Sequence, residues 1–197
     1  MSKKTYRHKV VNVDVNNVLD NFSDSILELY NKDHGTDFTS DDITEYDIAS
    51  SIGASMDTFL PDYLLHPRTM ENCKPALGAI DGLKYLNDTY TVNIVTAMEF
   101  KQLVVAEEFF KKYFPFINPT QIIRCSDKSK VPADVLIDDC LDNILYWTWG
   151  RVLVDKPWNR QISDCEYFIS RARNWEEIVC SVDLMLNDSP RKISNRR

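Results

Sequence analysis

The sequence is poor in positive charge, glycine and histidine, and it contains no long apolar run. Its 197 residues include 23 Lys and Arg against 30 Asp and Glu, which gives a formal net charge of −7. Because a protein that binds the phosphate backbone of nucleic acid needs a basic surface, we expect no stable nucleic-acid complex. The apolar runs fall far short of the ~20 residues that span a bilayer, so we expect no membrane segment. The basic amino terminus leads into no apolar stretch, which predicts no targeting signal.

The cysteines are too scattered to predict a zinc site or a disulfide framework. Both kinds of site need closely spaced cysteines or partner histidines, and this chain has only three histidines. We therefore expect a cytoplasmic protein in which the cysteines are reduced and act as small apolar residues. The five cysteines are Cys73, Cys125, Cys140, Cys165 and Cys180.

The remaining composition favours one folded domain. Hydrophobic residues make up 44% of the chain and aromatic residues 11%, which is enough for a core. Short β-branched runs predict strands at residues 10–13, 90–95, 121–124, 135–137 and 151–154. Apolar residues at helical spacing predict helices at residues 18–30, 77–86, 100–114 and 175–186. Strands that alternate with helices indicate an α/β fold with a mainly parallel sheet.

Residues 36–72 break this alternation. They are rich in Asp, Ser and Thr, and Pro61 and Pro67 interrupt their short apolar groups, so we expect short helices joined by loops. Two aromatic residues in this segment, Phe59 and Tyr63, either pack in a core or offer stacking surface to a planar ligand.

The carboxy-terminal third is rich in tryptophan. We expect Trp147, Trp149 and Trp175 to seal a helix layer against the sheet. The basic last ten residues are expected to form a solvated tail.

Polar residues follow three of the predicted strands. Asp14 and Thr96 each end a strand, and the pair Asp138-Asp139 ends a third. Taken singly, an Asp at the end of a strand more often caps a helix or begins a turn than belongs to a functional site. In a parallel sheet, however, these strand ends converge in one crevice. Two adjacent carboxylates there repel each other unless a cation is present, and hard oxygen ligands suit Mg²⁺. Lys128 precedes the last of these strands and could reach the same crevice.

These segments resemble a known superfamily. The first has the sequence Asp14-Val15-Asn16-Asn17-Val18-Leu19 and resembles the first motif of the haloacid dehalogenase (HAD) superfamily, usually Asp-x-Asp-Gly-Val/Thr-Leu. Thr96 resembles its second motif, Lys128 its third, and residues 135–139 its fourth. Within the superfamily the chain is most similar to the 5′(3′)-deoxyribonucleotidases of bacteria and phages. The segments that carry this closer likeness are residues 18–22, 127–129, 133–139, 154–160 and 174–178.

The resemblance implies a fold. We expect a HAD-like, Rossmann-type α/β core with helices on both faces of a parallel sheet, formed by residues 1–22 and 75–197. A small helical cap, residues 23–74, is inserted after the first strand. Such a cap closes over the site and excludes water.

The resemblance also implies a reaction, the hydrolysis of deoxynucleoside monophosphates through an aspartyl phosphate on Asp14. Thr96 and Lys128 would bind the phosphate. Mg²⁺ would be held by Asp14, by the backbone carbonyl of Asn16 and by Asp139, with support from Asp138. The resemblance further predicts the residues that contact the substrate. Phe22 would form one face of a slot for the base, and the other contacts would come from Tyr46, Ala97 and Trp158. The sequence is compatible with a homodimer.

Asn16 departs from the family motif Asp-x-Asp, in which the residue at this position is the second Asp. That Asp protonates the leaving sugar oxygen and later activates water, whereas an amide exchanges no proton at neutral pH. Three explanations stay open at this stage: an engineered substitution that traps substrate, a natural loss of activity, or a shift of chemistry. The alternative function is a catalytically inactive protein that binds or sequesters a nucleotide.

Overall fold

The computed structural model describes residues 9–187. The basic amino terminus and the tail expected at residues 188–197 lie outside the described residues. No helix among the described residues is long and apolar enough to cross a membrane.

The core is built on one sheet of six parallel strands in the order β3-β2-β1-β4-β5-β6, which confirms the predicted α/β architecture. Val, Ile and Leu predominate in its central strands and most of these side chains are buried, as a sheet covered on both faces requires. The sequence did not predict the edge strand β6, because it is only three residues long and two of these are polar. The strands are β1 (Val10–Val13), β2 (Thr91–Thr96), β3 (Ile122–Arg124), β4 (Val135–Asp138), β5 (Gly150–Val154) and β6 (Ser170–Ala172).

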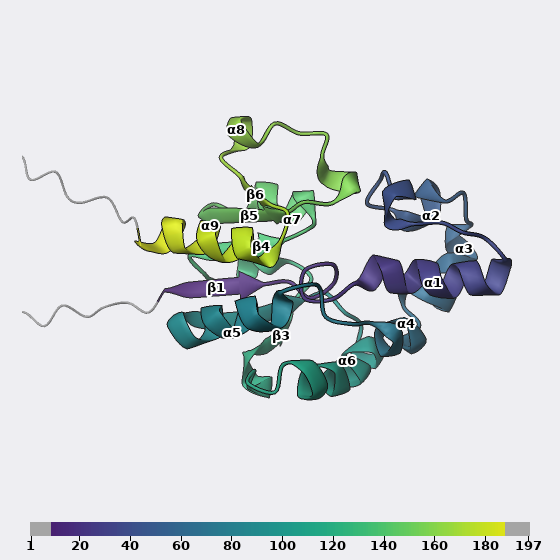
Figure 1. Cartoon of the computed structure of the whole chain (residues 1–197), viewed down its shortest axis with the longest axis horizontal. Coiled ribbons are helices and arrows are strands. Elements are labelled where there is room, and N and C mark those ends of the chain that lie inside the picture. Colours follow the sequence, from purple (N-terminus) through teal and green to yellow (C-terminus); the bar gives the residue numbers. More distant parts are fainter. Residues whose placement is uncertain (1–8, 188–197) are drawn as a thin grey trace, which may run out of the picture.

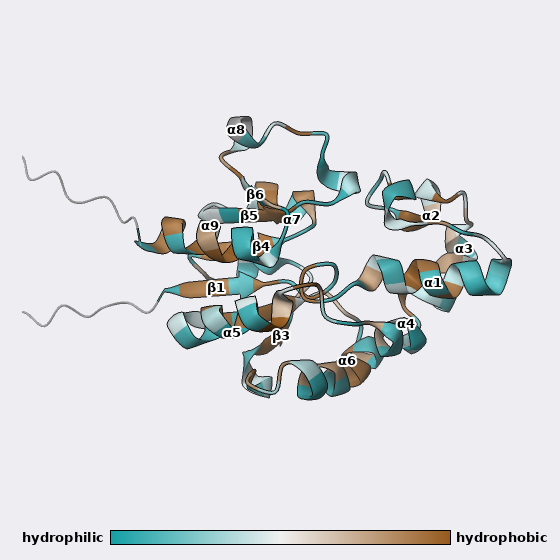
Figure 2. Cartoon of the chain, in the orientation of Figure 1, coloured by the Kyte–Doolittle hydropathy of each residue, from teal (hydrophilic) through white to brown (hydrophobic). Residues whose placement is uncertain are grey.

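Helices cover both faces of this sheet, as expected (Figure 1). Along β4, Val135 and Ile137 belong to one hydrophobic cluster and Leu136 to another, because successive side chains of a strand point to opposite faces. Helices α5 (Ala79–Thr89) and α9 (Trp175–Asn187) pack together over the first face, and α7 (Leu141–Tyr146) covers the second. Helices α6 (Phe100–Tyr113) and α8 (Asp164–Tyr167) complete the core. Figure 2 shows strands that are largely hydrophobic beside helices that carry both hydrophobic and hydrophilic residues.

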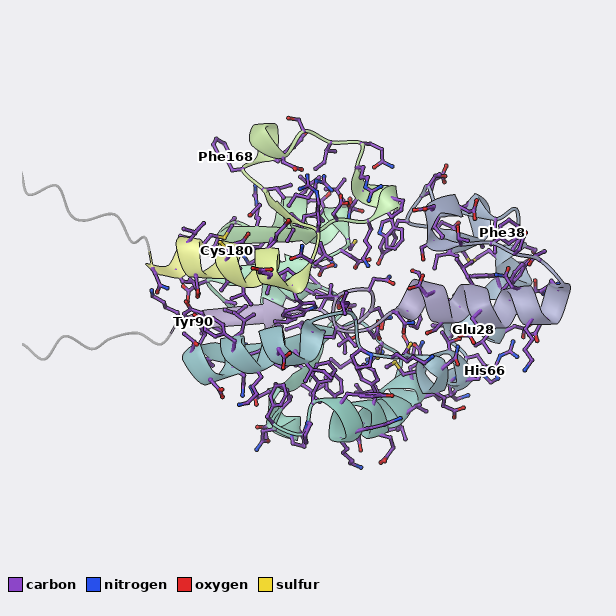
Figure 3. The ribbon with its side chains drawn as sticks, viewed as in Figure 1. Glu28, Phe38, His66, Tyr90, Phe168 and Cys180 are labelled. Atoms are coloured by element: carbon purple, nitrogen blue, oxygen red, sulfur yellow. The ribbon has the colours of Figure 1, made fainter. Side chains whose placement is uncertain are left out.

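The inserted segment forms a helical subdomain beyond the carboxyl ends of the strands (Figure 1). It begins with α1 (Phe22–His34) and continues through short turns, as its prolines and polar residues predicted. Figure 3 shows Glu28, Phe38 and His66 on this subdomain, at the opposite end of the molecule from Tyr90 and Cys180. The other elements are a 3-10 turn (Ser40–Asp42), α2 (Ile48–Ser51), α3 (Met56–Phe59), a π-helical turn (Leu60–Leu64) and α4 (Pro67–Asn72).

Two chain crossings, side by side, connect the core to this cap. The backbone N–H of Asn21 donates to the carbonyl of Lys74 at 3.1 Å, and the N–H of Lys74 donates to the Asn21 side chain at 2.7 Å. Asp20 and Pro75 form an isolated bridge beside them. These contacts support our proposal that the cap comprises residues 23–74.

The predicted helix at residues 18–30 is wrong at its start, since α1 begins at Phe22. Val18 and Leu19 are buried in a tight turn after β1, in which the N–H of Leu19 donates to the carbonyl of Val15 at 2.8 Å. Asn17 in this turn has a left-handed backbone, with φ of 61°. Burial of these apolar side chains in the core produced the apparent helical spacing.

The tryptophan prediction holds for two of its three residues. Trp147 and Trp175 are buried against the sheet, but Trp149 is 72% exposed, in the turn that leads into β5. The sequence could not separate Trp147 from Trp149, because the two lie in the same polar turn.

A buried carboxylate, Asp20, shapes the turn after β1. Its Oδ1 accepts hydrogen bonds from the N–H groups of Asn17 at 2.9 Å and Phe22 at 3.1 Å. Its Oδ2 is buried and has no partner among the described residues. Burial, opposed by the two N–H donors, raises the pKa of Asp20 from 3.8 to about 8.

This carboxylate should make the stability of the protein depend on pH. Between pH about 4 and about 8 the folded state holds a proton on Asp20 that the unfolded chain has released, so its contribution to stability falls as pH rises. Asp20→Asn keeps the accepting oxygen and cannot ionise. The free energy of unfolding of the variant, relative to that of the unsubstituted chain, should therefore rise by about 1.4 kcal/mol per pH unit from pH 5 to pH 7. Urea denaturation of both forms at pH 5, 6 and 7 measures this, and a difference that does not change with pH would contradict it.

Candidate active site

A cavity of about 470 Å³ lies between the carboxyl ends of the strands and the cap. Nine of the ten residues that the sequence assigned to a site line it, and they come from five separate strand ends and loops of the core as well as from the cap. The tenth, Asp138, lies behind the cavity wall. The nine are Asp14, Asn16, Phe22, Tyr46, Thr96, Ala97, Lys128, Asp139 and Trp158.

Lys128 joins two carboxylates at the floor of the cavity. Its Nζ lies 2.6 Å from Asp14 Oδ1 and 2.7 Å from Asp138 Oδ2, and all three side chains are at most one-tenth exposed. Burial alone would lower the pKa of Lys128, but the two adjacent carboxylates raise it above its usual value. The ammonium therefore stays charged and fixes the direction in which Asp14 points.

Asp138 and Asp139 are adjacent in sequence but have different surroundings. Asp138 accepts from Lys128, from the N–H of Cys140 at 2.8 Å and from Asn143 Nδ2 at 3.0 Å. Asp139 faces the cavity, and its carboxylate accepts one hydrogen bond within the described residues, from Asn17 Nδ2 at 3.3 Å. Asp138 thus anchors its neighbours, whereas Asp139 has oxygen lone pairs to spare.

The site residues fit a hard cation. One carboxylate oxygen from each of Asp14, Asp138 and Asp139 lies within 4.8 Å of the others. Burial raises the pKa of Asp14 to about 6, with Lys128 opposing the rise. Burial and the charges of Asp138 and Asp14 raise the pKa of Asp139 well above its usual value. The Oδ1 of Asn16 is also buried without a partner among the described residues. Oxygen donors under this mutual repulsion are what Mg²⁺ prefers.

Thr96 occupies the end of β2, beside the carboxylates. It is 2% exposed, and its Oγ1 accepts from the N–H of Met98 at 3.2 Å, which leaves the hydroxyl proton free to donate. With Lys128 it supplies two donors to the floor of the cavity, and such a pair suits an anionic group.

The upper part of the cavity is apolar and comes mainly from the cap. Phe22 and Phe59 are buried in its wall. Tyr63 lies outside this wall, and its hydroxyl donates to the carboxylate of Asp33 at 3.0 Å. Tyr46 is 63% exposed at the rim. The sequence did not single out Ile48, Met56, Leu64 and Leu65, which complete the apolar wall.

Polar residues on the wall were also missed, among them Asn143, Gln102 and Ser23. Asn143 comes from α7, and Gln102 donates to the carbonyl of Leu64 in the cap at 2.8 Å. Ser23 lies at the start of α1. Nothing in their sequence context distinguishes them from ordinary surface residues, because their place in the site depends on how the cap docks.

The chain is similar in sequence to known bacterial proteins. The chain is 27% identical to a 5′(3′)-deoxyribonucleotidase of Clostridium acetobutylicum over 84% of its own length and 89% of that protein. It is 34% identical to the enzyme of the same name from Bacillus subtilis, over 52% of its length and 60% of that protein.

Solved structures with low sequence identity share the fold. A haloacid dehalogenase-like hydrolase from Streptococcus pneumoniae superposes with a TM-score of 0.61 at 14% identity, over 89% of this chain and 98% of that one. A HAD hydrolase of Bacillus subtilis, solved with bound magnesium, gives a TM-score of 0.56 at 15% identity, over 87% and 97%.

One family matches nearly the whole chain, and its match runs from residue 8 to residue 187. It therefore includes the turn after β1, Lys128, the two adjacent carboxylates and the entire cap. The match and the relatives show a phosphoric monoester hydrolase on a HAD-like fold. The chain belongs to the family of 5′ nucleotidase, deoxy (pyrimidine), cytosolic type C proteins.

Proposed function

We propose that this protein is a Mg²⁺-dependent phosphatase of deoxyribonucleoside monophosphates, in which Asn16 impairs turnover. The observation that carries the proposal is the buried ammonium of Lys128 between Asp14 and Asp138, at the floor of a cavity with an apolar roof. A phosphate would meet the polar floor, and a base would meet the apolar wall. The names of the relatives support this class of substrate.

Asp14 is the proposed nucleophile. Its carboxylate oxygen would form a bond to phosphorus as the ester P–O bond breaks, and water would then hydrolyse the aspartyl phosphate. Lys128 holds Asp14 in one orientation and neutralises charge on the phosphoryl oxygens. The Thr96 hydroxyl would donate to one of those oxygens.

Asp14, the backbone carbonyl of Asn16 and Asp139 would hold the Mg²⁺. The ion supplies positive charge to the phosphoryl group and orients the in-line displacement. Asp138 supports the site indirectly, because its own oxygens are already occupied by Lys128, Cys140 and Asn143.

The cap is proposed to bind the base and to exclude water. Phe22 and Phe59 provide aromatic surface on the cavity wall, and stacking on such surface is worth ~1–3 kcal/mol per base in related settings. Trp158 also lines the cavity, and Ala97 follows Thr96, the residue proposed to bind the phosphate. The cytoplasm is the proposed location, consistent with the free cysteines among the described residues.

Asn16 limits this chemistry. The leaving sugar oxygen needs a proton, and the carboxamide has none to give at neutral pH. Within the described residues its Oδ1 is buried and accepts no hydrogen bond.

A second candidate function is a protein that binds the nucleotide without hydrolysing it. The observation that favours it is Asn16 in an otherwise complete cavity. Calorimetry with a panel of deoxynucleoside monophosphates and Mg²⁺, beside a phosphate-release assay, separates the two. Binding without release by both the Asn16 form and an Asn16→Asp form would favour the binding protein, and absence of binding would reject the nucleotide assignment.

Asn16→Asp should create or restore phosphatase activity. The two side chains are nearly isosteric, so packing and the backbone carbonyl of residue 16 should not change. We expect phosphate release to rise by about 10²-fold or more, which corresponds to about 2.7 kcal/mol of barrier. The measurement is phosphate release from the same panel under saturating Mg²⁺, and equal inertness of both forms would count against the phosphatase.

Asp139→Ala should weaken Mg²⁺ binding severely. The change removes an anionic ligand that faces the cavity, whereas Asp142→Ala, on the exposed side of α7, removes an equal charge nearby. Calorimetric titration with Mg²⁺ compares the two variants with the unsubstituted chain. If Asp139→Ala binds Mg²⁺ as Asp142→Ala does, Asp139 is not a ligand.

A further inference from the structure

Asn17 stands at the position where the resembling family usually has glycine. Its backbone is left-handed, with φ of 61°, a conformation that glycine adopts freely and asparagine tolerates better than most residues. Glycine would meet the backbone requirement by itself. Whatever asparagine adds must therefore come from its side chain.

The side chain of Asn17 contacts two different parts of the molecule. Its Nδ2 donates to Asp139 Oδ2 at 3.3 Å, and its Oδ1 accepts from the N–H of Ser23 at 2.9 Å. Ser23 lies in the first turn of α1, the helix that opens the cap. One carboxamide thus connects a carboxylate of the core to the first helix of the cap.

The contact with α1 replaces an ordinary helix cap. Asn21 precedes the helix, but its side chain makes no capping hydrogen bond. Instead, Asp20 accepts from the N–H of Phe22, and Asn17 accepts from the N–H of Ser23. These two residues satisfy N–H groups that a helix leaves unpaired at its start.

The contact with Asp139 is the more consequential one. Asp138 is held by three donors, namely Lys128, Cys140 and Asn143. Within the described residues the carboxylate of Asp139 is held only by Asn17. The carboxamide thus orients Asp139 through Oδ2, and Oδ1 accepts no hydrogen bond within the described residues.

We propose that Asn17 is a positioning residue that orients Asp139 for the metal and ties this carboxylate to the first turn of the cap. The inference rests on the proposed function, in which Asp139 is a Mg²⁺ ligand. Hydrogen-bond partners of metal ligands typically affect metal affinity by ~10–100-fold when they are removed. The tie also makes the orientation of Asp139 depend on where α1 begins.

The test compares two variants with the unsubstituted chain by calorimetric titration of Mg²⁺ at pH 7. Asn17→Gly removes the carboxamide and keeps the left-handed backbone unstrained, so the turn should still form. Asn31→Ala is the matched control. It removes a carboxamide at the other end of α1, where Asn31 binds Thr36 and Phe38 far from the carboxylates.

We expect Asn17→Gly to weaken Mg²⁺ binding by about 10-fold or more, and Asn31→Ala to leave it within about 2-fold while lowering the thermal unfolding temperature. In an Asn16→Asp background, Asn17→Gly should raise the Mg²⁺ concentration for half-maximal activity and leave kcat at saturating Mg²⁺ nearly unchanged. That split separates a positioning role from a general loss of structure.

Two results would overturn the inference: unchanged Mg²⁺ affinity in Asn17→Gly, or equal weakening in both variants. The unsubstituted chain reports separately on the proposed function. If that chain binds no Mg²⁺ at millimolar concentrations, the proposed metal site fails, and the role of Asn17 fails with it.

Discussion

The rest of the site depends on the buried contact between Lys128 and the carboxylates of Asp14 and Asp138. Taking three charges out of water is costly, and the cost is offset only where the pairing is close and the remaining atoms are hydrogen-bonded. Both conditions hold, with contacts of 2.6 and 2.7 Å and with further donors on Asp138. The triad therefore fixes the ends of β1 and β4 relative to the loop that carries Lys128. The carboxylate of Asp139 takes no part in the triad and faces the cavity, where it can attract a cation.

The turn after β1 transmits this order to the cap. In seven residues, from Asp14 to Asp20, the chain leaves the sheet, reverses through a left-handed residue and enters the crossing to α1. The side chains of Asn17 and Asp20 accept hydrogen bonds from backbone N–H groups and so stabilise a turn that is not helical. The proposed nucleophile and the crossing to the cap thus belong to the same short segment.

The sequence predicted the elements whose signal is local. Buried β-branched runs marked the central strands, and the carboxylates at their ends marked the site, because parallel strands end at one edge. It failed where a residue's role depends on distant contacts. Val18 and Leu19 mimicked a helix because the core buries both of them, and the roles of Asn143 and Gln102 depend on how α7 and the cap pack.

The paired crossings at Asn21 and Lys74 are the points where the chain passes between the core and the cap. A rotation of the cap about this hinge would displace each residue in proportion to its distance from the hinge. Phe22, next to the hinge, would keep its place in the cavity wall. The far end of α1 lies roughly 20 Å away for a helix of this length, and a rotation of about 10° would carry it by about 3 Å. Under such a rotation one side of the proposed base slot would stay in place and the other would move, while the contacts of Asn17 with Ser23 and Asp139 would link the start of α1 to the carboxylate beneath it.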